Sequence, residues 1–454
     1  MKPVPVLLAA SLALLACAVL PSSLLSDQST GEPPTAPPCV PNEQGSGCLP
    51  IAPDSERVDL APPSFSNPTH IDNRLHPTGV VQSAVYLGRV EGLPFRSEVT
   101  LLPRTKTIFW NGQQVEVLES QYVADLDGRI HEVARDWYAQ ADDGSVWYFG
   151  EDVFNYKDGA LVDTHGTWLA GRDGPAAMIM PAFHQAGDVY RPENIPGLVF
   201  KEVIVQSIGI TVDGPSGPTP GAIIVRELHI DGSYQEKTFA PGYGEFSTGG
   251  DGDLEALALA VPTDSQTWPM PRELRAMSAD AGRIFENVSL DDWGAAQITL
   301  ADVDSAWQGL RAMDVPPLLL ANQMDGALML LHETLDGRQV QSALQADIHL
   351  SRAVLDLQLI FRPPTEIDLN RFELWVRQFG LDAAAGETSA VFGDAASLEW
   401  IRDRFVLTLT ASEADQLDGL LEEMRSALEA GDLGAAAEAA ARLGEVVRLM
   451  IGGG

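Results

Sequence analysis

The chain has 454 residues, of which 45% are apolar, and its 64 acidic residues exceed its 29 basic residues to give a formal net charge of −35. This length is too great for one ordinary hydrophobic core and indicates two domains. A surface this negative repels phosphate backbones and anionic lipid headgroups, which argues against nucleic acid as a partner. The acidic residues are expected to keep the protein soluble outside a cell; the alternative is cation binding spread over that surface.

Residues 1–17 are predicted to be a lipoprotein signal peptide. Lys2 precedes an apolar run from Val6 to Ala16, which has the length of a signal peptide and is too short to span a bilayer. The run ends in Leu-Leu-Ala-Cys at Cys17, which resembles the lipobox of bacterial lipoproteins. The resemblance implies that Cys17 is acylated and becomes the mature N-terminus. The alternative is a secretory signal that is cut elsewhere.

The predicted location follows from this signal. No later segment is long and apolar enough to span a membrane, so the N-terminal lipid would be the only anchor and the membrane a partner through it. Ala18 stands where an aspartate commonly retains lipoproteins at the inner membrane. We therefore expect a protein of the cell envelope, at the outer membrane if the cell has two membranes; the alternative is a secreted protein.

Residues 18–68 are predicted to be a tether, because they are rich in Pro, Ser and Gly and poor in aromatic residues. Cys39 and Cys48 are the two cysteines that remain beside Cys17. In an oxidising compartment such a pair is expected to form a disulfide, which here would staple a linker rather than a core.

Residues 69–262 are predicted to be an antiparallel β domain. Its centre is the run DWYAQADDGSVWYFGE, Asp136 to Glu151, which reads as two aromatic strands that turn on Asp142-Asp143-Gly144. A second hairpin is expected to follow at Lys157-Asp158-Gly159. Short strands with Asn-Gly and Asp-Gly turns between them, at Asn111, Asp127 and Asp231, indicate a meander, a sandwich or an open barrel.

Residues 263–287 contain Pro and Ser and are predicted to be a linker with one short helical stretch. From residue 288 to 454 the apolar period becomes helical and predicts five or six helices in an antiparallel α-helical bundle. The expected helix starts are Asp394, Ser412 with Asp415 at the capping-box spacing, and Asp432. The fold class is therefore α+β in two domains.

Four sequence segments in the same order resemble an uncharacterised family of secreted bacterial proteins and lipoproteins. They are DWYAQADDGSVWYFGE, then HGTW, MIMPA and FAPGYGEF. The resemblance covers about residues 73–261 and implies an exported antiparallel β domain. It carries no activity, so no catalytic residue is transferred from it.

The candidate ligand-binding residues are five aromatic residues: Trp137, Tyr138, Trp147, Tyr148 and Trp168. Such rings offer a large contact area to a lipid, a sugar or an aromatic ligand. Neighbours in a strand point to opposite faces, so Trp137 and Tyr138 cannot share one, and one set is expected to be core while the other points outward. The alternative is that all of these rings belong to the core.

No catalytic residue, metal site or cofactor is predicted. The sequence contains no Gly-x-Ser-x-Gly, no phosphate loop, no dinucleotide fingerprint and no His-Glu-x-x-His. His165 and His184 could meet Met178 or Met180 at a soft-metal site, but separate structural positions are the preferred interpretation. Asp136 and Glu151 bracket the first hairpin; a glycosidase pair would need a set separation and one raised pKa, neither of which can be read from the sequence.

The resulting hypothesis is an envelope-anchored lipoprotein that is not an enzyme and that binds a small apolar ligand or an envelope protein. The first alternative is an envelope hydrolase with its site in the β domain, and the second is metal handling by the acidic bundle. A binding role predicts an apolar cavity. A hydrolase predicts a cleft where a histidine and a carboxylate converge, and metal handling predicts carboxylates clustered on facing helices.

Overall fold

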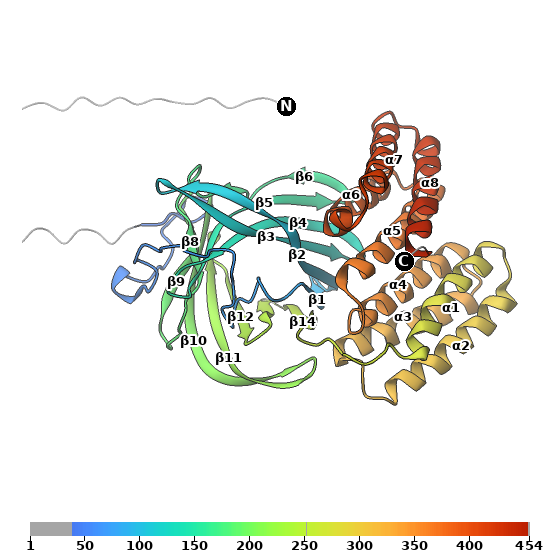
Figure 1. The fold of residues 1–454 in the computed structure, drawn as a ribbon, viewed down its shortest axis with the longest axis horizontal. Helices are drawn as coiled ribbons and strands as arrows, with labels where there is room; N and C mark the ends of the chain where they lie inside the picture. The colour runs from blue at the N-terminus through green and yellow to red at the C-terminus, as the bar shows by residue number, and fades with distance from the viewer. Residues whose placement is uncertain (1–38, 251, 453–454) are drawn as a thin grey trace, which may run out of the picture. The chain divides into compact units, whose positions relative to one another are not determined.

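The computed structural model describes residues 39–250 and 252–452. The predicted signal peptide, Cys17 and residues 18–38 of the predicted tether lie outside the described residues. The described chain forms one 14-stranded antiparallel sheet followed by eight α-helices (Figure 1). The sheet is an open meander rather than a closed barrel or a sandwich. The predicted α+β architecture is therefore confirmed.

The strands are numbered in chain order. Their bounds are β1 Ser83–Val90, β2 Leu93–Trp110, β3 Gln113–Leu126, β4 Arg129–Gln140, β5 Val146–Lys157, β6 Ala160–Asp163, β7 Trp168–Leu169, β8 Ala177–Met180, β9 Val189–Ile195, β10 Val199–Gly214, β11 Gly217–His229, β12 Tyr234–Ala240, β13 Gly244–Gly250 and β14 Asp253–Val261. The two predicted hairpins share a strand, because β5 is continuous and pairs with β4 on one side and with β6 on the other.

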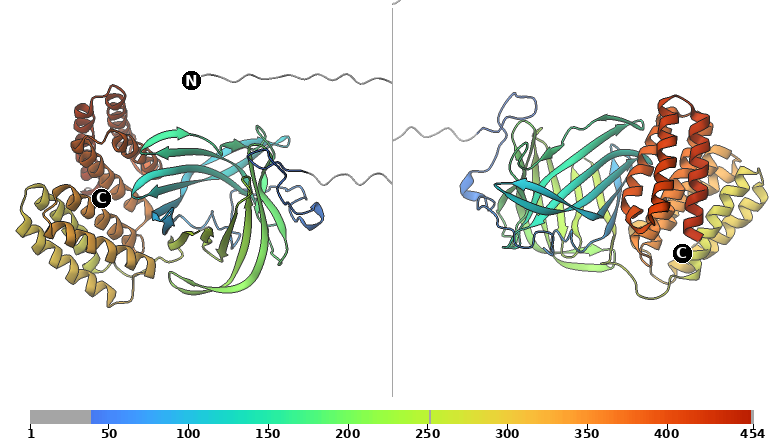
Figure 2. Two further views of the ribbon diagram at one scale, coloured as in Figure 1. Left: turned by 180° about the vertical axis from the view of Figure 1, so that it is seen from behind. Right: turned by 45° about the horizontal axis from the view of Figure 1, so that its top comes forward.

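Two meanders make up the sheet. The strand order is β6-β5-β4-β3-β2-β1-β14-β13-β12-β11-β10-β9, so that the first and last strands of the domain pair with each other in its middle. β7 and β8 both pair with β5 outside this path. The sheet curves strongly, and β2–β5 come to lie opposite β10–β12 in all the views (Figure 2).

Tight turns fix the register of the long hairpins. Both central residues have positive φ in Glu91-Gly92, Asn111-Gly112, Asp127-Gly128 and Asp158-Gly159. This is the backbone of type I′ turns, whose twist matches that of the flanking strands and which Asn-Gly and Asp-Gly favour. The Asn-Gly and Asp-Gly pairs that begin at residues 111, 127 and 158 therefore form the turns that the sequence predicted.

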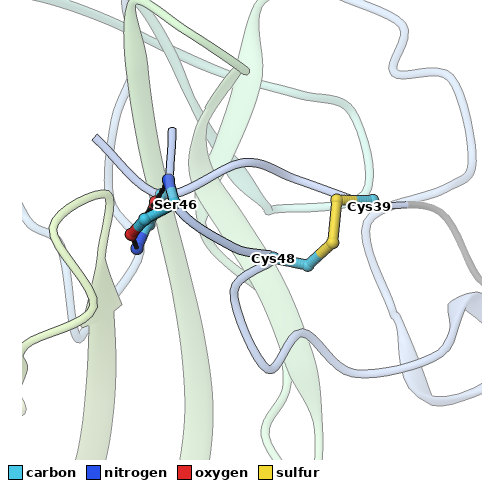
Figure 3. Close-up of a disulfide and its surroundings, with 4 residues drawn as sticks. Cys39, Ser46 and Cys48 are labelled. Carbon is cyan, nitrogen blue, oxygen red and sulfur yellow. Dashed lines mark hydrogen bonds between the residues drawn. A yellow bond between two sulfur atoms is a disulfide. The ribbon is translucent and has the colours of Figure 1, made fainter. Parts of the chain in front are cut away.

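Residues 39–68, expected to be part of an extended tether, instead lie against the sheet. A disulfide joins Cys39 to Cys48 (Figure 3). On either side of it, Val40 and Leu49 are buried. Further along, Phe65 makes edge contacts with aromatic rings of the sheet. A few apolar side chains thus hold a segment whose composition alone indicated a linker.

The helices begin earlier than predicted. Their bounds are α1 Arg272–Ser289, α2 Trp293–Arg311, α3 Leu318–Asp336, α4 Val340–Gln358, α5 Pro364–Ala385, α6 Thr388–Phe405, α7 Ala411–Glu429 and α8 Leu433–Gly452. Most of the predicted linker is therefore α1, whose apolar side is buried among the other helices. No helix in residues 39–250 and 252–452 is long and apolar enough to cross a membrane.

Two of the three predicted helix starts are wrong. Asp394 lies inside α6 and is buried, and the capping box of α7 is formed by Thr410 and Glu413 rather than by Ser412 and Asp415. Asp432 does begin α8, because its carboxylate accepts a hydrogen bond from the backbone of Ala435. The N-cap is the residue whose backbone is no longer helical, and the sequence alone does not say which of several neighbouring polar residues that is.

Ion pairs join the outer face of the sheet to the helices. Arg404 of α6 donates to Glu98 of β2 and, at 2.6 Å, to Oε1 of Gln121 of β3. Arg96 of β2 donates to Asp356 of α4 at 2.7 Å. All of these carboxylates are nearly fully buried, so the sheet and the helices are held together by charged groups that water hardly reaches.

Candidate functional site

The inner face of the curved sheet surrounds a cavity of about 500 Å³. This volume lies in the range of small-molecule sites. The ionisable residues that line it are His76, His131, Glu132, Asp136, Glu151, Glu193, Lys201, Glu227, Lys237, Glu245, Asp253 and Glu255, and the lining tyrosines are Tyr86, Tyr122, Tyr138, Tyr148, Tyr190 and Tyr243. The cavity therefore has many acidic groups beside apolar residues such as Val99, Leu101 and Phe239, and it is not the purely apolar cavity that a binding role predicted.

Strand alternation places part of this lining. In β4 every second residue from Glu132 through Ala134 and Asp136 to Tyr138 lines the cavity. Successive side chains of a strand point to opposite faces, so the residues between them face outward. In β3 the same rule sends Tyr122 inward and Gln121 outward, where it meets the helices.

A bulge in β5 adds Glu151 to the site. Tyr148 pairs with Tyr138 and Glu151 pairs with Asp136, so three residues of β5 span the same distance as two of β4. Without the extra residue, Tyr148 and Glu151 would point to opposite faces. The bulge uses Gly150, which has a φ of 123° and where a Cβ would lie 2.3 Å from the Trp168 carbonyl oxygen. The glycine of the YFGE motif is thus required by the backbone.

Asp136 and Glu151 face each other on neighbouring strands inside the cavity. The Tyr148 hydroxyl donates a hydrogen bond to Asp136 Oδ1 at 2.5 Å. Burial, together with the charges of Glu132 and Glu193, raises the pKa of Asp136 to about 7 although the Tyr148 bond opposes this. Burial and the charges of Glu193 and Asp136 hold the pKa of Glu151 well above its usual value. Both groups therefore hold protons more tightly than ordinary carboxylates.

Two lysines balance part of the negative charge. Lys201 donates to Glu193 Oε1 at 2.8 Å, across the β9–β10 pair. Lys237 lies 3.5 Å from a carboxylate oxygen of Glu227 and 3.3 Å from one of Glu245. The charges of these partners raise the pKa of both lysines despite their burial, so they stay protonated.

Aromatic rings complete the wall. Tyr138 and Tyr148 stack with centroids 4.9 Å apart and planes inclined by 19°. The rings of His76 and Tyr138 meet edge to face, with their centroids 4.8 Å apart. Burial lowers the pKa of His76 to about 4, which keeps the imidazole neutral. Tyr190 is 1% exposed, and its hydroxyl has no hydrogen-bond partner among the described residues. The wall therefore contains aromatic rings and one lining tyrosine with an unsatisfied hydroxyl.

The five predicted aromatic residues divide between two faces. Tyr138 and Tyr148 line the cavity. Trp137, Trp147 and Trp168 do not line it, and they pack in the cluster that contains Phe149 and Ala139. Trp137 follows Asp136 and so faces the other side of the sheet.

Sequence reasoning missed most of the charged lining. Glu193, Lys201 and Glu227 were not considered as site residues, because a charged residue in a strand normally marks a solvated face. The available signal was the strand phase itself: Glu132 and Asp136 share a face with Tyr138 at a spacing of two. Recognising that face as interior requires knowing that the sheet curves around it.

The histidines and methionines do not build the soft-metal site considered above. His184 Nε2 lies 3.1 Å from Met180 Sδ, while His165 is exposed elsewhere at the end of β6. In residues 39–250 and 252–452 no three His, Cys, Asp or Glu side chains come together in a way that could hold a metal ion.

A second cavity of about 350 Å³ lies between β4 and the helices α6 and α7. Its charged groups satisfy one another: Arg402 bonds Asp418 at 2.6 Å, Arg425 bonds Glu399, and Arg135 bonds Asp403. We therefore take the cavity inside the sheet as the candidate site.

The chain was compared with known proteins as well. No protein-family model matches it, and no curated protein matches it either.

Proposed function

We propose that this protein is an envelope-anchored lipoprotein that binds a small ligand in the cavity of its β domain and is not an enzyme. The observation that carries the proposal is the cavity itself. It has about 500 Å³ of space, and its lining includes Tyr190, whose buried hydroxyl has no hydrogen-bond partner among the described residues. A buried polar group without a partner costs about 1–3 kcal/mol, which a bound ligand that makes the hydrogen bond would recover.

The test is native mass spectrometry of the mature chain purified gently from its own envelope. A bound small molecule is expected, and the variant Ala134→Phe should lose it because Ala134 lines the cavity between Glu132 and Asp136. The matched control is Ala160→Phe, since Ala160 is exposed on β6. A ligand that stays bound in Ala134→Phe, or that leaves both variants equally, would contradict the proposal.

The anchor is proposed on the sequence alone. Acylation of Cys17 would place the β domain at the membrane surface, and at the outer membrane in a cell with two membranes. The variant Cys17→Ser should move the protein from the membrane fraction to the soluble fraction and remove a diacylglycerol mass from its N-terminus. Membrane association that is unchanged in this variant would exclude the lipid anchor.

A hydrolase acting on glycosides is the second candidate. Directly opposed residues of an antiparallel pair hold their Cβ atoms about 4.5–5.5 Å apart, and retaining glycosidases place two carboxyl groups about 5–5.5 Å apart. Asp136 and Glu151 are such a pair, and both have raised pKa values. Hydrolysis of aryl glycosides by the natural chain that disappears in Glu151→Gln would establish the enzyme. If both forms bind these substrates and neither cleaves them, the enzyme is excluded.

A further inference from the structure

The charge of the cavity is unbalanced. Eight carboxyl groups line it, against two lysines. The lysines are already engaged, Lys201 with Glu193 and Lys237 with Glu227 and Glu245. Among the described residues, five of the eight carboxylates have no basic side chain within 4.0 Å. They are Glu132, Asp136, Glu151, Asp253 and Glu255.

These unbalanced groups are spread across the wall. Asp136 and Glu151 lie on β4 and β5, whereas Glu255 lies on β14, and the sheet order puts β3, β2 and β1 between them. A single metal ion needs its ligands converging on one point at about 2–2.6 Å. Carboxylates distributed over a concave wall instead suit the separate N–H groups of a polyatomic cation.

The aromatic part of the wall fits the same kind of ligand. The stacked pair of Tyr138 and Tyr148 offers ring faces, which attract cations through their quadrupole by about 0.5–2 kcal/mol. Tyr190 also lines the cavity, and its buried hydroxyl has no hydrogen-bond partner among the described residues. This unpartnered polar group in the lining is an observation independent of the carboxylates.

We propose that the ligand is a small organic cation whose ammonium or guanidinium groups bind the carboxylates of Asp136, Glu151 and Glu255 between the tyrosines of the cavity. This inference rests on the proposed function, because it assumes that the cavity is the binding site. An anionic ligand would meet the same carboxylates at close range and be repelled.

Proton release should accompany this binding. In the empty cavity, burial raises the pKa of Asp136 and of Glu255 to about 7, so these groups are partly protonated near neutral pH. A bound cation favours their ionised forms and expels those protons. Amines keep their own charge over this range, so their affinity should rise between about pH 5 and about pH 8.

The experiment is calorimetry of the mature chain with two sets of matched probes. One set is 1,4-diaminobutane, 1,4-butanediol and succinate; the other is benzylamine, benzyl alcohol and benzoate. Within each set the skeleton is similar and the charge changes from positive through neutral to negative. The amine of at least one set should bind about tenfold or more tightly than its alcohol, with proton release that differs between buffers of different ionisation enthalpy.

A pair of variants locates the effect. Glu151→Gln should weaken amine binding about tenfold, because it removes a carboxyl group that a bound cation would hold in its ionised form, without changing the side-chain shape. The control is Glu236→Gln, an exposed residue of β12 next to Lys237, which should leave the affinity unchanged. Because the variant could be unstable, its thermal unfolding is measured alongside, and a folded Glu151→Gln protein with unchanged amine affinity overturns the inference.

The outcomes also separate this inference from the proposed function. If an alcohol or an acid binds as tightly as its amine, or if no amine binds, the ligand is not an organic cation. The proposed function survives this result when the envelope-purified chain carries a ligand that Ala134→Phe loses. It fails with the inference when no ligand depends on Ala134.

Discussion

Arg404 of α6 hydrogen-bonds the carboxylate of Glu98 in β2, although 306 residues separate them in the sequence. Arg404 is 2% exposed and Glu98 is 6% exposed, so neither group has water as an alternative partner. Burial opposes ionisation of Glu98, but the charges of Arg371, Arg96 and Arg404 outweigh it and hold the pKa of Glu98 well below its usual value. The sheet and the helices are therefore expected to unfold together.

Removing Arg404 should destabilise both parts of the chain. Arg404→Met leaves the Glu98 charge buried with fewer partners, which costs about 3–5 kcal/mol in comparable buried pairs. The free energy of unfolding, measured in urea by helix circular dichroism and by tryptophan fluorescence, should fall by this amount. Both signals should give the same midpoint. The control is Arg442→Met, which breaks an exposed pair with Glu423 and should cost about 0–1 kcal/mol. Equal effects of the two variants would show that the buried pair is not important.

A methyl group at residue 150 should disturb the bulge of β5. In Gly150→Ala the added Cβ meets the Trp168 carbonyl oxygen in a conformation that disfavours side chains, and we expect a loss of about 2 kcal/mol or more. Gly112→Ala is the matched control, since its φ of 79° is also positive but nothing lies within 4 Å, and it should cost about 1 kcal/mol. Thermal unfolding measures both. A smaller loss at residue 150 than at residue 112 would contradict the close approach.

Asp136 should make the empty protein less stable as the pH rises. Its pKa is about 7 in the folded chain and about 4 when unfolded, so the folded state binds more protons between these values. Stability from this group is complete below about pH 4 and is lost as the pH rises through about 7. Asp136→Asn lacks this dependence and should gain roughly 1 kcal/mol or more over the natural chain from about pH 4 to about pH 8.

The measurement is the melting temperature of the natural chain, Asp136→Asn and Glu236→Gln across that pH range. Other buried carboxylates, such as Glu227 with its lowered pKa, add the opposite trend in all three proteins, so only the differences between curves are informative. The Glu236→Gln curve should run parallel to the natural one. A parallel Asp136→Asn curve would mean that Asp136 ionises normally.

The Cys39–Cys48 disulfide should act locally. A loop of this length stabilises by about 2–3 kcal/mol in the chain-entropy model, and here it supports the backbone bond from Leu49 N to Val40 O at 2.8 Å. In the double variant Cys39→Ser/Cys48→Ser, hydrogen exchange of the Leu49 amide should speed up roughly a hundredfold. Amides of β4 and β5 should be unaffected; faster exchange there would mean that the disulfide supports the whole sheet.

Local signals in the sequence predicted the hairpins and the apolar sides of several helices, although five or six helices were expected and eight are present in the described residues. Asn111-Gly112 and Asp127-Gly128 take the backbone that these pairs favour, and the stripe from Phe372 to Phe379 is the buried side of α5. The conformation of these turns and of this helix is determined by residues only a few positions apart in the sequence. For the same reason the two-part α+β architecture could be read from the periods alone.

The candidate site could be predicted only in part, because it depends on distant pairing. Tyr138 and Tyr148 were identified as ring-bearing ligand candidates, but Glu255 enters their cavity only through the pairing of β14 with β1. The bulge at Gly150 also brings Glu151 to the same face as Tyr148, and a single extra residue leaves no clear mark in a hydrophobic pattern. The burial of Val40 and Leu49 likewise required the sheet they pack on.

The pairing of β1 with β14 has a consequence for how the chain is made. β1 emerges from the ribosome long before β14, and contacts between such distant segments form slowly. Until they meet, β1 presents an unpaired edge, which exposes the folding chain to pairing with other chains and to aggregation. In pulsed hydrogen exchange during refolding, β1 and β14 should gain protection together and after the β4–β5 hairpin; early protection of β1 at its β14 edge would refute this order.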